Sequence, residues 1–407
     1  MLSPDQLAII KQTVPVLQVN GELLTRHFYQ RLFRENPEVL AFFNPAHQRA
    51  GSQQRALAGA ILAYAQNIEN PAVLGSAVEL IAQKHVSLGI QPEHYPVVGA
   101  NLLGSIREVL GEAATDAVID AWASAYGQLA DIFIAREAEI YAQQEQQHGW
   151  RGFKRFVVAR REPASENIVS LYLQAEDGQP LREHRPGQYL TLRVSLPDGQ
   201  KVMRNYSISN RPGSEQFRIS VKRERALQEG APHGVCSSFL HERLQEGDVV
   251  EISPPCGEFT LKDVSEPGLP LVLIAGGVGI TPVLSMLHAA LVEQQDREII
   301  FIQCALNGTT RPFAAELASL QAAHRNLRVH VRFSEPSPAD RASGEHDSEG
   351  FLDDALLASL VGENRAEYYL CGPTPMLQHG YKLLRSRDVQ EQDIHYEFFG
   401  PASALAA

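Results

Sequence analysis

The sequence has few cysteines, and their spacing does not suit a shared metal. Only four occur in 407 residues, namely Cys236, Cys256, Cys304 and Cys371. No two of them form a CxxC pair, which disfavours a structural zinc site and an iron–sulfur cluster. Four widely separated cysteines also disfavour a disulfide framework. The chain is therefore expected in a reducing compartment, the cytoplasm.

Long apolar runs and an excess of positive charge are also missing. No stretch approaches the roughly 18 apolar residues of a membrane span, and Met1 to Lys11 lacks the features of a signal peptide. The chain has 36 Lys and Arg against 48 Asp and Glu, a net charge of −12. Such a balance disfavours nucleic acid or an anionic membrane as a partner. The hydrophobic share of 44% is ordinary for a globular protein.

The sequence pattern changes twice along the chain. The first part is helical throughout, and Asn-Pro and Gln-Pro pairs interrupt it. Short alternating runs separated by turns follow, which is typical of an antiparallel barrel. Continuous apolar strands then alternate with helical stretches, which indicates a parallel sheet. We predict an all-α domain over 1–147, an antiparallel β-barrel over 148–267 and an α/β parallel-sheet domain over 268–407.

Two polar segments are predicted to lie outside the regular elements. Residues 143–149 (QQEQQHG) indicate a linker or a fraying helix end. Residues 334–349 (SEPSPADRASGEHDSE) indicate an exposed loop.

In the helical third, a histidine and a carboxylate lie on apolar helix faces. His85 continues the stripe of Leu74, Val78 and Ile81, and Glu137 falls between Phe133 and Ile140. A carboxylate on such a face is costly unless it is paired. A metal-bound histidine usually donates its other N–H to a carboxylate or carbonyl. We predict that His85 binds a metal and bonds to Glu137, with Tyr95 close by. The alternatives are a core histidine without a metal and a surface position for Glu137.

Two polar side chains adjoin apolar surface on the earlier helices. Gln53 stands one turn before Leu57, and Tyr29 adjoins the apolar surface of its own helix. Both can donate hydrogen bonds to a ligand held in an apolar pocket. Core packing would explain each of them alone.

The barrel third carries a paired motif that suits a flavin. Arg204-Asn205-Tyr206-Ser207 follows a segment that ends at Tyr189 (RPGQY). An arginine can pair with a pyrophosphate, a serine can bond to the flavin edge, and an aromatic ring can stack on the flavin. The short motif alone is open to chance, but the pair is specific.

The last third carries a glycine-rich loop after a buried strand. The strand at 271–275 runs into Gly277-Val278-Gly279-Ile280-Thr281-Pro282, and a helix is predicted to start at Pro282. Such a unit lets backbone N–H groups approach a pyrophosphate at a helix N-terminus. A lone glycine-rich turn would be weak evidence, because this loop is not the strict GxGxxG pattern.

Together these segments resemble the flavohaemoglobins, in which a globin is joined to a reductase of the ferredoxin-reductase type. The globin matches are HFYQRLF (27–33), FFNPAHQRAG (42–51), QRALAGAILAYAQNIENP (54–71), IAQKH (81–85) and REAEIY (136–141). The reductase matches are the two motifs above, Cys371-Gly372-Pro373, and the C-terminal run that ends at Pro401. The resemblance covers nearly the whole chain.

The resemblance implies a role for each residue of a haem b site. His85 is the proximal ligand, and Tyr95 and Glu137 form a proximal relay. Tyr29 and Gln53 are the distal hydrogen-bond donors. The other implied haem-site residues are Phe43 against the haem face, Leu57 above the iron, and Lys84, which tunes the haem potential.

It also implies the residues around FAD and the nicotinamide. Ser237 belongs to the phosphate-binding segment, although residues 224–232 form a longer link than is usual there. Cys371 and Gly372 lie near the nicotinamide, and Glu397 influences the potentials. The C-terminal aromatic before Gly400-Pro401 is Phe399, which stacks on the flavin. Phe398 precedes it, where many relatives have cysteine.

The implied activity is that of a nitric oxide dioxygenase. NAD(P)H reduces FAD, FAD passes electrons to haem, and nitric oxide and O₂ become nitrate. The expected partners are these small molecules, and the chain is expected to be a monomer. A haem-based sensor and a flavin reductase for other acceptors stay open as alternatives. The choice between NADH and NADPH also stays open, because Arg311 can accept a 2′-phosphate or be solvated.

Overall fold

The computed structural model describes residues 2–44, 48, 51–224, 234–264, 266, 268–362 and 365–400. Pro401, predicted in the flavin site, and residues 225–232 of the longer link lie outside the described residues. The chain divides into two compact units. The first is Met1–Phe153 with Arg193–Arg204, and the second is Lys154–Leu192 with Asn205–Ala407.

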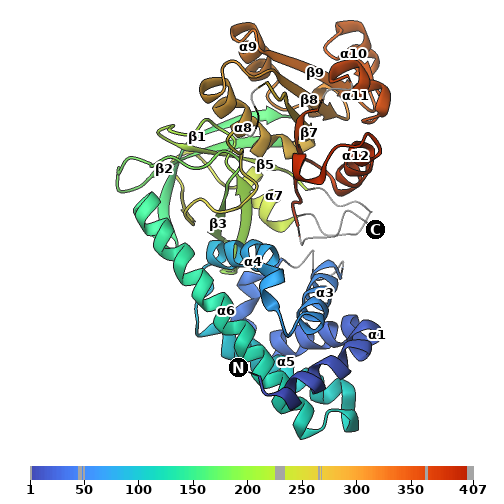
Figure 1. The fold of residues 1–407 in the computed structure, drawn as a ribbon. Coiled ribbons are helices and arrows are strands. Elements are labelled where there is room, and N and C mark those ends of the chain that lie inside the picture. The colour runs from blue at the N-terminus through green and yellow to red at the C-terminus, as the bar shows by residue number, and fades with distance from the viewer. Residues whose placement is uncertain are drawn as a thin grey trace. The chain divides into compact units, whose positions relative to one another are not determined.

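The N-terminal part of the first unit is built from α-helices (Figure 1). They are α1 (Pro4–Glu35), α3 (Ser52–Gln66), α4 (Gly75–Leu88), α5 (His94–Leu110) and α6 (Asp116–His148). Short 3₁₀ turns join them, namely η1 (Pro37–Phe42), η2 (Pro71–Leu74) and η3 (Gly111–Ala113).

Local sequence sets the limits of these helices. A capping box between Ser3 and Gln6 starts α1, and Pro37 follows its end at Asn36. The apolar faces of α1, α3, α5 and α6 meet in one core that includes Phe28, Tyr64 and Trp122. Burying such a side chain stabilises the fold by roughly 1.5–3 kcal/mol.

Helix α6 runs through the segment predicted as a linker or a fraying helix end. The side chains of Gln144 and His148 are buried, and the helix ends at Gly149 with a φ of +85°. Residues 143–148 are therefore a packed helix end and no linker. Polar composition alone could not decide between the two alternatives, because it does not reveal which side of the helix is covered.

After the helices, the chain forms a six-stranded antiparallel sheet in the order β4-β3-β6-β1-β2-β5. Its strands are β1 (Lys154–Ser165), β2 (Ile168–Ala175), β3 (Tyr189–Ser195), β4 (Lys201–Ser207), β5 (Phe217–Lys222) and β6 (Val249–Ile252). A bridge between Ile208 and Ile219 joins the end of β4 to β5. The sheet is thus closed as a barrel, and helix α7 (Val235–Glu242) follows β5.

The remainder of the second unit is a parallel sheet in the order β10-β9-β8-β7-β11-β12. Its strands are β7 (Leu271–Gly276), β8 (Ile299–Ala305), β9 (Leu327–Phe333), β10 (Ser348–Glu349), β11 (Glu367–Cys371) and β12 (Ile394–Glu397). Its helices are α8 (Ile280–Glu293), α9 (Ala314–Ala323), α10 (Pro338–Ser343), α11 (Asp354–Leu360) and α12 (Thr374–Ser386).

Helices cover both faces of the parallel sheet. Side chains of α8 and α9 pack on one face, and those of α11 and α12 pack on the other. The predicted fold class is confirmed: a helical domain, an antiparallel barrel and a doubly wound parallel sheet. The prediction of a loop over 334–349 is wrong in part, because Ser337 caps α10 there and β10 pairs with β9. Both elements are too short to show a periodic pattern.

Among the described residues, no helix is long and apolar enough to cross a membrane.

Candidate functional site

Three helices of the first unit bring His85, Tyr95 and Glu137 together. The His85 Nδ1–H donates to Glu137 Oε1 at 2.7 Å, and the Tyr95 hydroxyl donates to the same oxygen at 2.5 Å. The Tyr95 oxygen also lies 3.2 Å from His85 Nδ1. Glu137 is 2% exposed. The three side chains therefore form one closed hydrogen-bonded group.

Close packing holds α5 in the position that this group needs. A Cβ on Gly99 would lie 2.6 Å from the Tyr126 ring, so only glycine lets the two helices approach so closely. The Tyr126 hydroxyl then donates to the carbonyl of Tyr95 at 2.6 Å. On the other side, the Phe133 ring lies 5.6 Å from the His85 ring.

The arrangement around His85 suits haem better than a bare metal ion. The side chain of His85 is 33% exposed, and the ring bonds within the described residues only through Nδ1. Nε2 is thus left for a metal. The described residues contain no group of three or more His, Cys, Asp or Glu that could hold a metal ion. A single protein ligand is what haem would need, because the porphyrin brings its own nitrogen donors.

Tyr29 and Gln53 form a second pair in the same unit. Tyr29 is 6% exposed. Burial raises the pKa of the Tyr29 phenol above its usual range, and a side-chain hydrogen bond with Gln53 opposes that rise. The phenol therefore stays neutral and able to donate. Gln48 holds the Gln53 side chain with a 2.9 Å hydrogen bond to Oε1.

The other predicted haem-site residues differ in their surroundings. The Tyr29 ring lies 5.6 Å from the Phe43 ring, and Phe43 and Leu57 pack against the same apolar core. Lys84 has an exposed side chain, and its carbonyl accepts a hydrogen bond from Ser87. Its predicted role in tuning the haem potential stays a prediction.

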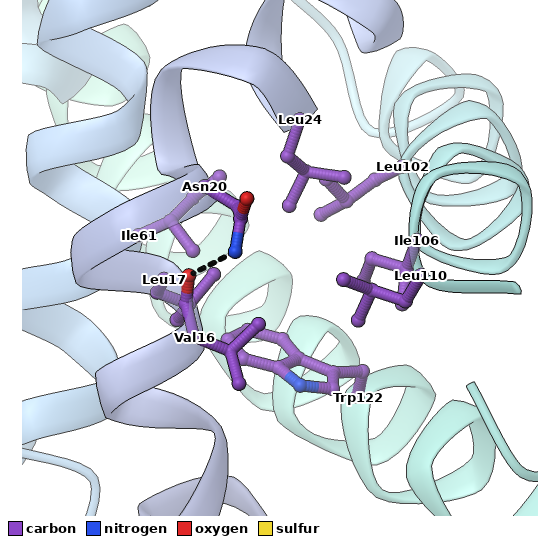
Figure 2. Close-up of a pocket in the computed structure, with 9 residues that line it drawn as sticks. All are labelled: Val16, Leu17, Asn20, Leu24, Ile61, Leu102, Ile106, Leu110 and Trp122. Carbon is purple, nitrogen blue, oxygen red and sulfur yellow. Dashed lines mark hydrogen bonds between the residues drawn. The ribbon is translucent and has the colours of Figure 1, made fainter. Parts of the chain in front are cut away.

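A small cavity elsewhere in the first unit contains none of these residues (Figure 2). Its lining is apolar apart from Asn20, whose amide donates to the Val16 carbonyl at 3.2 Å. The other lining residues are Leu17, Leu24, Ile61, Leu102, Ile106, Leu110 and Trp122. It is distinct from the predicted haem-site residues.

Strand β4 carries the predicted flavin motif. Arg204 and Tyr206 are half-buried, Asn205 is exposed and Ser207 is buried. One arm of Arg204 donates to the Met203 carbonyl at 2.6 Å. No carboxylate among the described residues pairs with its guanidinium, which fits a group that receives an anionic ligand. The predicted contacts of these four residues with FAD stay predictions.

The other predicted flavin residues lie near the ends of strands and helices. Tyr189 pairs with Cys256 through two backbone hydrogen bonds, and its ring covers Gly257. The Ser237 hydroxyl donates to the Gly234 carbonyl and accepts from the Glu224 N–H. Ser237 is thus engaged with its own loop, and its contact with a phosphate is a prediction.

The glycine-rich loop after β7 lies directly against Cys371 and Gly372. A Cβ on Gly279 would lie 2.4 Å from the Cys371 carbonyl atoms and 2.5 Å from the Gly372 nitrogen. Gly277 has a φ of +53°, which favours glycine. Two motifs far apart in sequence therefore meet at the carboxyl ends of neighbouring strands, which is where such sheets bind nucleotides.

The helix after this loop begins at Ile280, so the prediction of a start at Pro282 is wrong by two residues. Proline is tolerated there because the first N–H groups of a helix lack partners within the helix. The side chains of Ile280, Thr281 and Pro282 are buried, and the Thr281 hydroxyl donates to the Val278 carbonyl at 3.0 Å.

The C-terminal strand places Glu397 beside Cys371 in the sheet register. Burial raises the pKa of the Cys371 thiol, and the charge of Glu397 raises it further. Phe398 packs against the core of its face, while Phe399 is 49% exposed. Gly400 bonds back to the Phe398 carbonyl. An exposed aromatic ring here suits stacking on a flavin.

Three family models match consecutive parts of the chain. They are the globin family over residues 26–133, the oxidoreductase FAD-binding domain over 155–261 and the oxidoreductase NAD-binding domain over 273–381. A curated flavohemoprotein from Rhodopirellula baltica is 47% identical over 408 residues. The alignment covers 100% of this chain and 100% of that relative. The chain belongs to the flavohemoprotein family.

Solved structures agree with this membership of the flavohemoproteins. A flavohemoglobin from Malassezia yamatoensis, solved with bound FAD and haem, matches 98% of this chain and all of its own at 27% identity and a TM-score of 0.83. The FAD/NAD-binding domain of a nitric oxide dioxygenase from Vibrio cholerae matches 60% of this chain and 97% of its own, at 29% identity and a TM-score of 0.54.

The sequence did not reveal one further group of this flavohemoprotein. Glu316 on α9 accepts two hydrogen bonds from Arg218 on β5, at 2.7 and 3.0 Å, and one from His288 on α8 at 2.7 Å. Arg218 also lies 4.7 Å from the centre of the Phe313 ring. This Glu316 cluster (Glu316, Arg218 and His288) joins the barrel to the nucleotide-binding sheet. No spacing rule connects residues so far apart in sequence.

Proposed function

We propose that this flavohemoprotein is a nitric oxide dioxygenase that uses haem b, FAD and NAD(P)H. The closed group of His85, Glu137 and Tyr95 carries the proposal, because it orients His85 to bind haem. The same chain contains the FAD-binding and NAD-binding domains that would supply electrons to that haem. The Vibrio cholerae relative, named as a nitric oxide dioxygenase, supports the same activity.

The bound cofactors supply the electron transfer. When bound, FAD turns hydride from the nicotinamide into single electrons, and haem supplies the iron at which dioxygen and nitric oxide combine to give nitrate. The protein's own contribution is to bind, orient and tune these groups.

On the proximal side, His85 would hold the haem iron through Nε2, the ring nitrogen that makes no hydrogen bond within the described residues. The carboxylate of Glu137 fixes the Nδ1–H tautomer and the direction of the ring. It also makes the imidazole a stronger donor, which favours oxygen activation over reversible binding. Tyr95 is a positioning residue, because its hydroxyl donates to the same Glu137 oxygen that accepts the hydrogen bond from the His85 Nδ1–H.

On the distal side, Tyr29 and Gln53 supply the polar groups of an otherwise apolar pocket. The buried Tyr29 hydroxyl stays protonated because burial raises its pKa. It can therefore donate a hydrogen bond to dioxygen, and Gln53 sets its direction. Phe43 and Leu57 exclude water by their apolar packing.

In the reductase, each residue would have one task toward FAD. Arg204 would pair with the pyrophosphate, and Tyr206 and Phe399 would supply aromatic rings for the flavin. The loop of Gly277 to Gly279 receives the nicotinamide nucleotide, and Cys371 and Gly372 border the nicotinamide.

The experiment is NO consumption by the purified protein, followed with an NO electrode. With NADH or NADPH, we expect continuous consumption in air and only stoichiometric binding without oxygen. Stoichiometric binding under both conditions would instead support a sensor. Rapid reduction of ferric chelates or cytochromes without NO turnover would support a reductase for other acceptors.

A further inference from the structure

Three glutamine side chains at the predicted distal side of the haem site form a chain of hydrogen bonds. Gln54 is buried, and its Nε2 donates to the Gln48 carbonyl at 3.1 Å and to Gln48 Oε1 at 2.8 Å. Gln48 Nε2 donates in turn to Gln53 Oε1 at 2.9 Å. Each amide therefore donates to the next one, and the chain of bonds ends at Gln53.

A backbone carbonyl fixes the direction of this chain. A carbonyl can only accept, so the group that Gln54 turns toward the Gln48 carbonyl has to be its NH2. The same NH2 donates to Gln48 Oε1, which leaves the NH2 of Gln48 for Gln53. Gln53 accordingly presents its oxygen to Gln48 and keeps its own NH2 for another partner. The orientation of the Gln53 amide is thus set by Gln48.

The backbone of Gln48 is itself held in place. Its N–H donates to the Asn44 carbonyl, and its carbonyl accepts from the Gly51 N–H, each at 3.2 Å. Gly51 directly precedes α3 and has a φ of +69°, a conformation that favours glycine. Gln48 is therefore anchored to the start of the helix that carries Gln53.

The remaining NH2 of Gln53 suits the predicted role of Tyr29. A side-chain hydrogen bond with Gln53 opposes the rise that burial causes in the pKa of the Tyr29 phenol. An amide N–H that donates to the phenol oxygen has this effect, because it stabilises the charged form. A Gln53 oxygen in the same place would instead accept the Tyr29 proton. The observed orientation thus leaves that proton for a ligand.

We propose that Gln48 is a positioning residue that holds the Gln53 amide with its NH2 toward Tyr29 and the haem ligand. The proposal rests on the haem site and the function proposed above. Gln48 acts through Gln53, whose orientation decides whether the distal side offers a donor or an acceptor. Hydrogen bonds that run in one direction also polarise one another, which strengthens the last donor.

The infrared spectrum of the ferrous CO complex of the full-length protein reports this orientation without turnover. A hydrogen-bond donor beside bound CO lowers its C–O stretching frequency, and an acceptor raises it. Gln48→Glu keeps the size and the acceptor for Gln54 but replaces the donor with a second acceptor. Gln53 then has to turn its NH2 toward residue 48. We expect the C–O band at higher wavenumber and, in stopped flow, O₂ dissociation at least about fivefold faster.

A second variant removes both polar groups of the side chain. In Gln48→Met, Gln54 keeps its bond to the backbone carbonyl of residue 48, and the Gln53 amide can adopt both orientations. We expect two C–O bands where the wild type has one. The matched control is Gln66→Glu, which adds the same charge at an exposed position at the end of α3. It should leave the band and the dissociation rate unchanged.

A double-mutant cycle separates positioning from a general structural effect. In a Gln53→Leu background, Gln48→Glu should not accelerate O₂ dissociation further, because Gln53 transmits its effect. Additive effects of the two substitutions would overturn the inference, as would an unchanged C–O band in both Gln48 variants. Failure of the proposed function looks different. In that case the C–O band still shifts in Gln48→Glu, while the wild type consumes no NO with either nucleotide.

Discussion

Removing the negative charge of Glu316 should cause a large, pH-dependent loss in the free energy of unfolding. Arg218 and His288 both donate to Glu316, and the side chains of Arg218 and Glu316 are 7% and 26% exposed. Burial alone would raise the pKa of Glu316, but the hydrogen bonds from His288 and Arg218 lower it from 4.5 to about 2. The substitution Glu316→Gln removes the charge and retains the size.

The magnitude follows from that pKa. One pKa unit corresponds to about 1.4 kcal/mol, so the lowered value corresponds to about 3 kcal/mol. Solvent screening at the partly exposed carboxylate reduces this figure, to about 2 kcal/mol. The variant also leaves the charge of Arg218 buried without its partner, which costs more. We expect a total loss of about 3 kcal/mol in the free energy of unfolding at pH 7.

The sign of the pH dependence is fixed by the lowered pKa. The stabilisation from ionised Glu316 is fully present above its unfolded value of 4.5, and it is lost as the pH falls toward about 2. The difference between wild type and Glu316→Gln should therefore shrink across that window.

The assay is urea unfolding followed by the fluorescence of released flavin. Flavin is the useful probe because both tryptophans, Trp122 and Trp150, lie in the first unit. The control is Glu349→Gln, whose carboxylate and partner Arg341 are both exposed, so the expected loss is much smaller than for Glu316→Gln. A Glu316→Gln variant within about 0.5 kcal/mol of wild type at pH 7, or an unchanged difference near pH 3, would refute the reasoning.

Three further substitutions test separate sites. Tyr29→Phe removes the buried hydroxyl that bonds to Gln53, and stopped flow should show faster dissociation of O₂; an unchanged rate would contradict its role as donor. Arg204→Ala should lower the bound flavin while haem absorbance is retained, and full flavin occupancy would count against the pyrophosphate contact. Gly279→Ala places a Cβ 2.4 Å from Cys371, so NADH oxidation should fall at least about tenfold with haem and FAD still bound; normal turnover would disprove the tight approach.

The order of the domains was predictable because the hydrophobic period changes along the chain. Helical spacing placed His85 and Glu137 on inward faces, and strict alternation marked strands such as β3 and β5. The continuous apolar run of β7 showed that both of its faces are covered.

The contacts between distant elements were not predictable in the same way. The hydrogen bonds from Arg218 to Glu316, and from Gly308 to Asp340, join residues whose separation follows no local period. The start of α8 at Ile280 was missed because the proline at position 282 is allowed anywhere in the first turn. Residue propensity and spacing predict individual helices and strands. Which side chains of distant elements contact each other depends on tertiary packing.

The most direct test of the central claim is the ratio of NO consumed to NADH oxidised, measured in air for the wild type and for His85→Ala. We expect about two NO per NADH in the wild type. In His85→Ala we expect no NO turnover, loss of the Soret band, and normal ferricyanide reduction from retained FAD. Continued NO consumption by His85→Ala, or a retained Soret band, would contradict the assignment of His85 as the haem ligand.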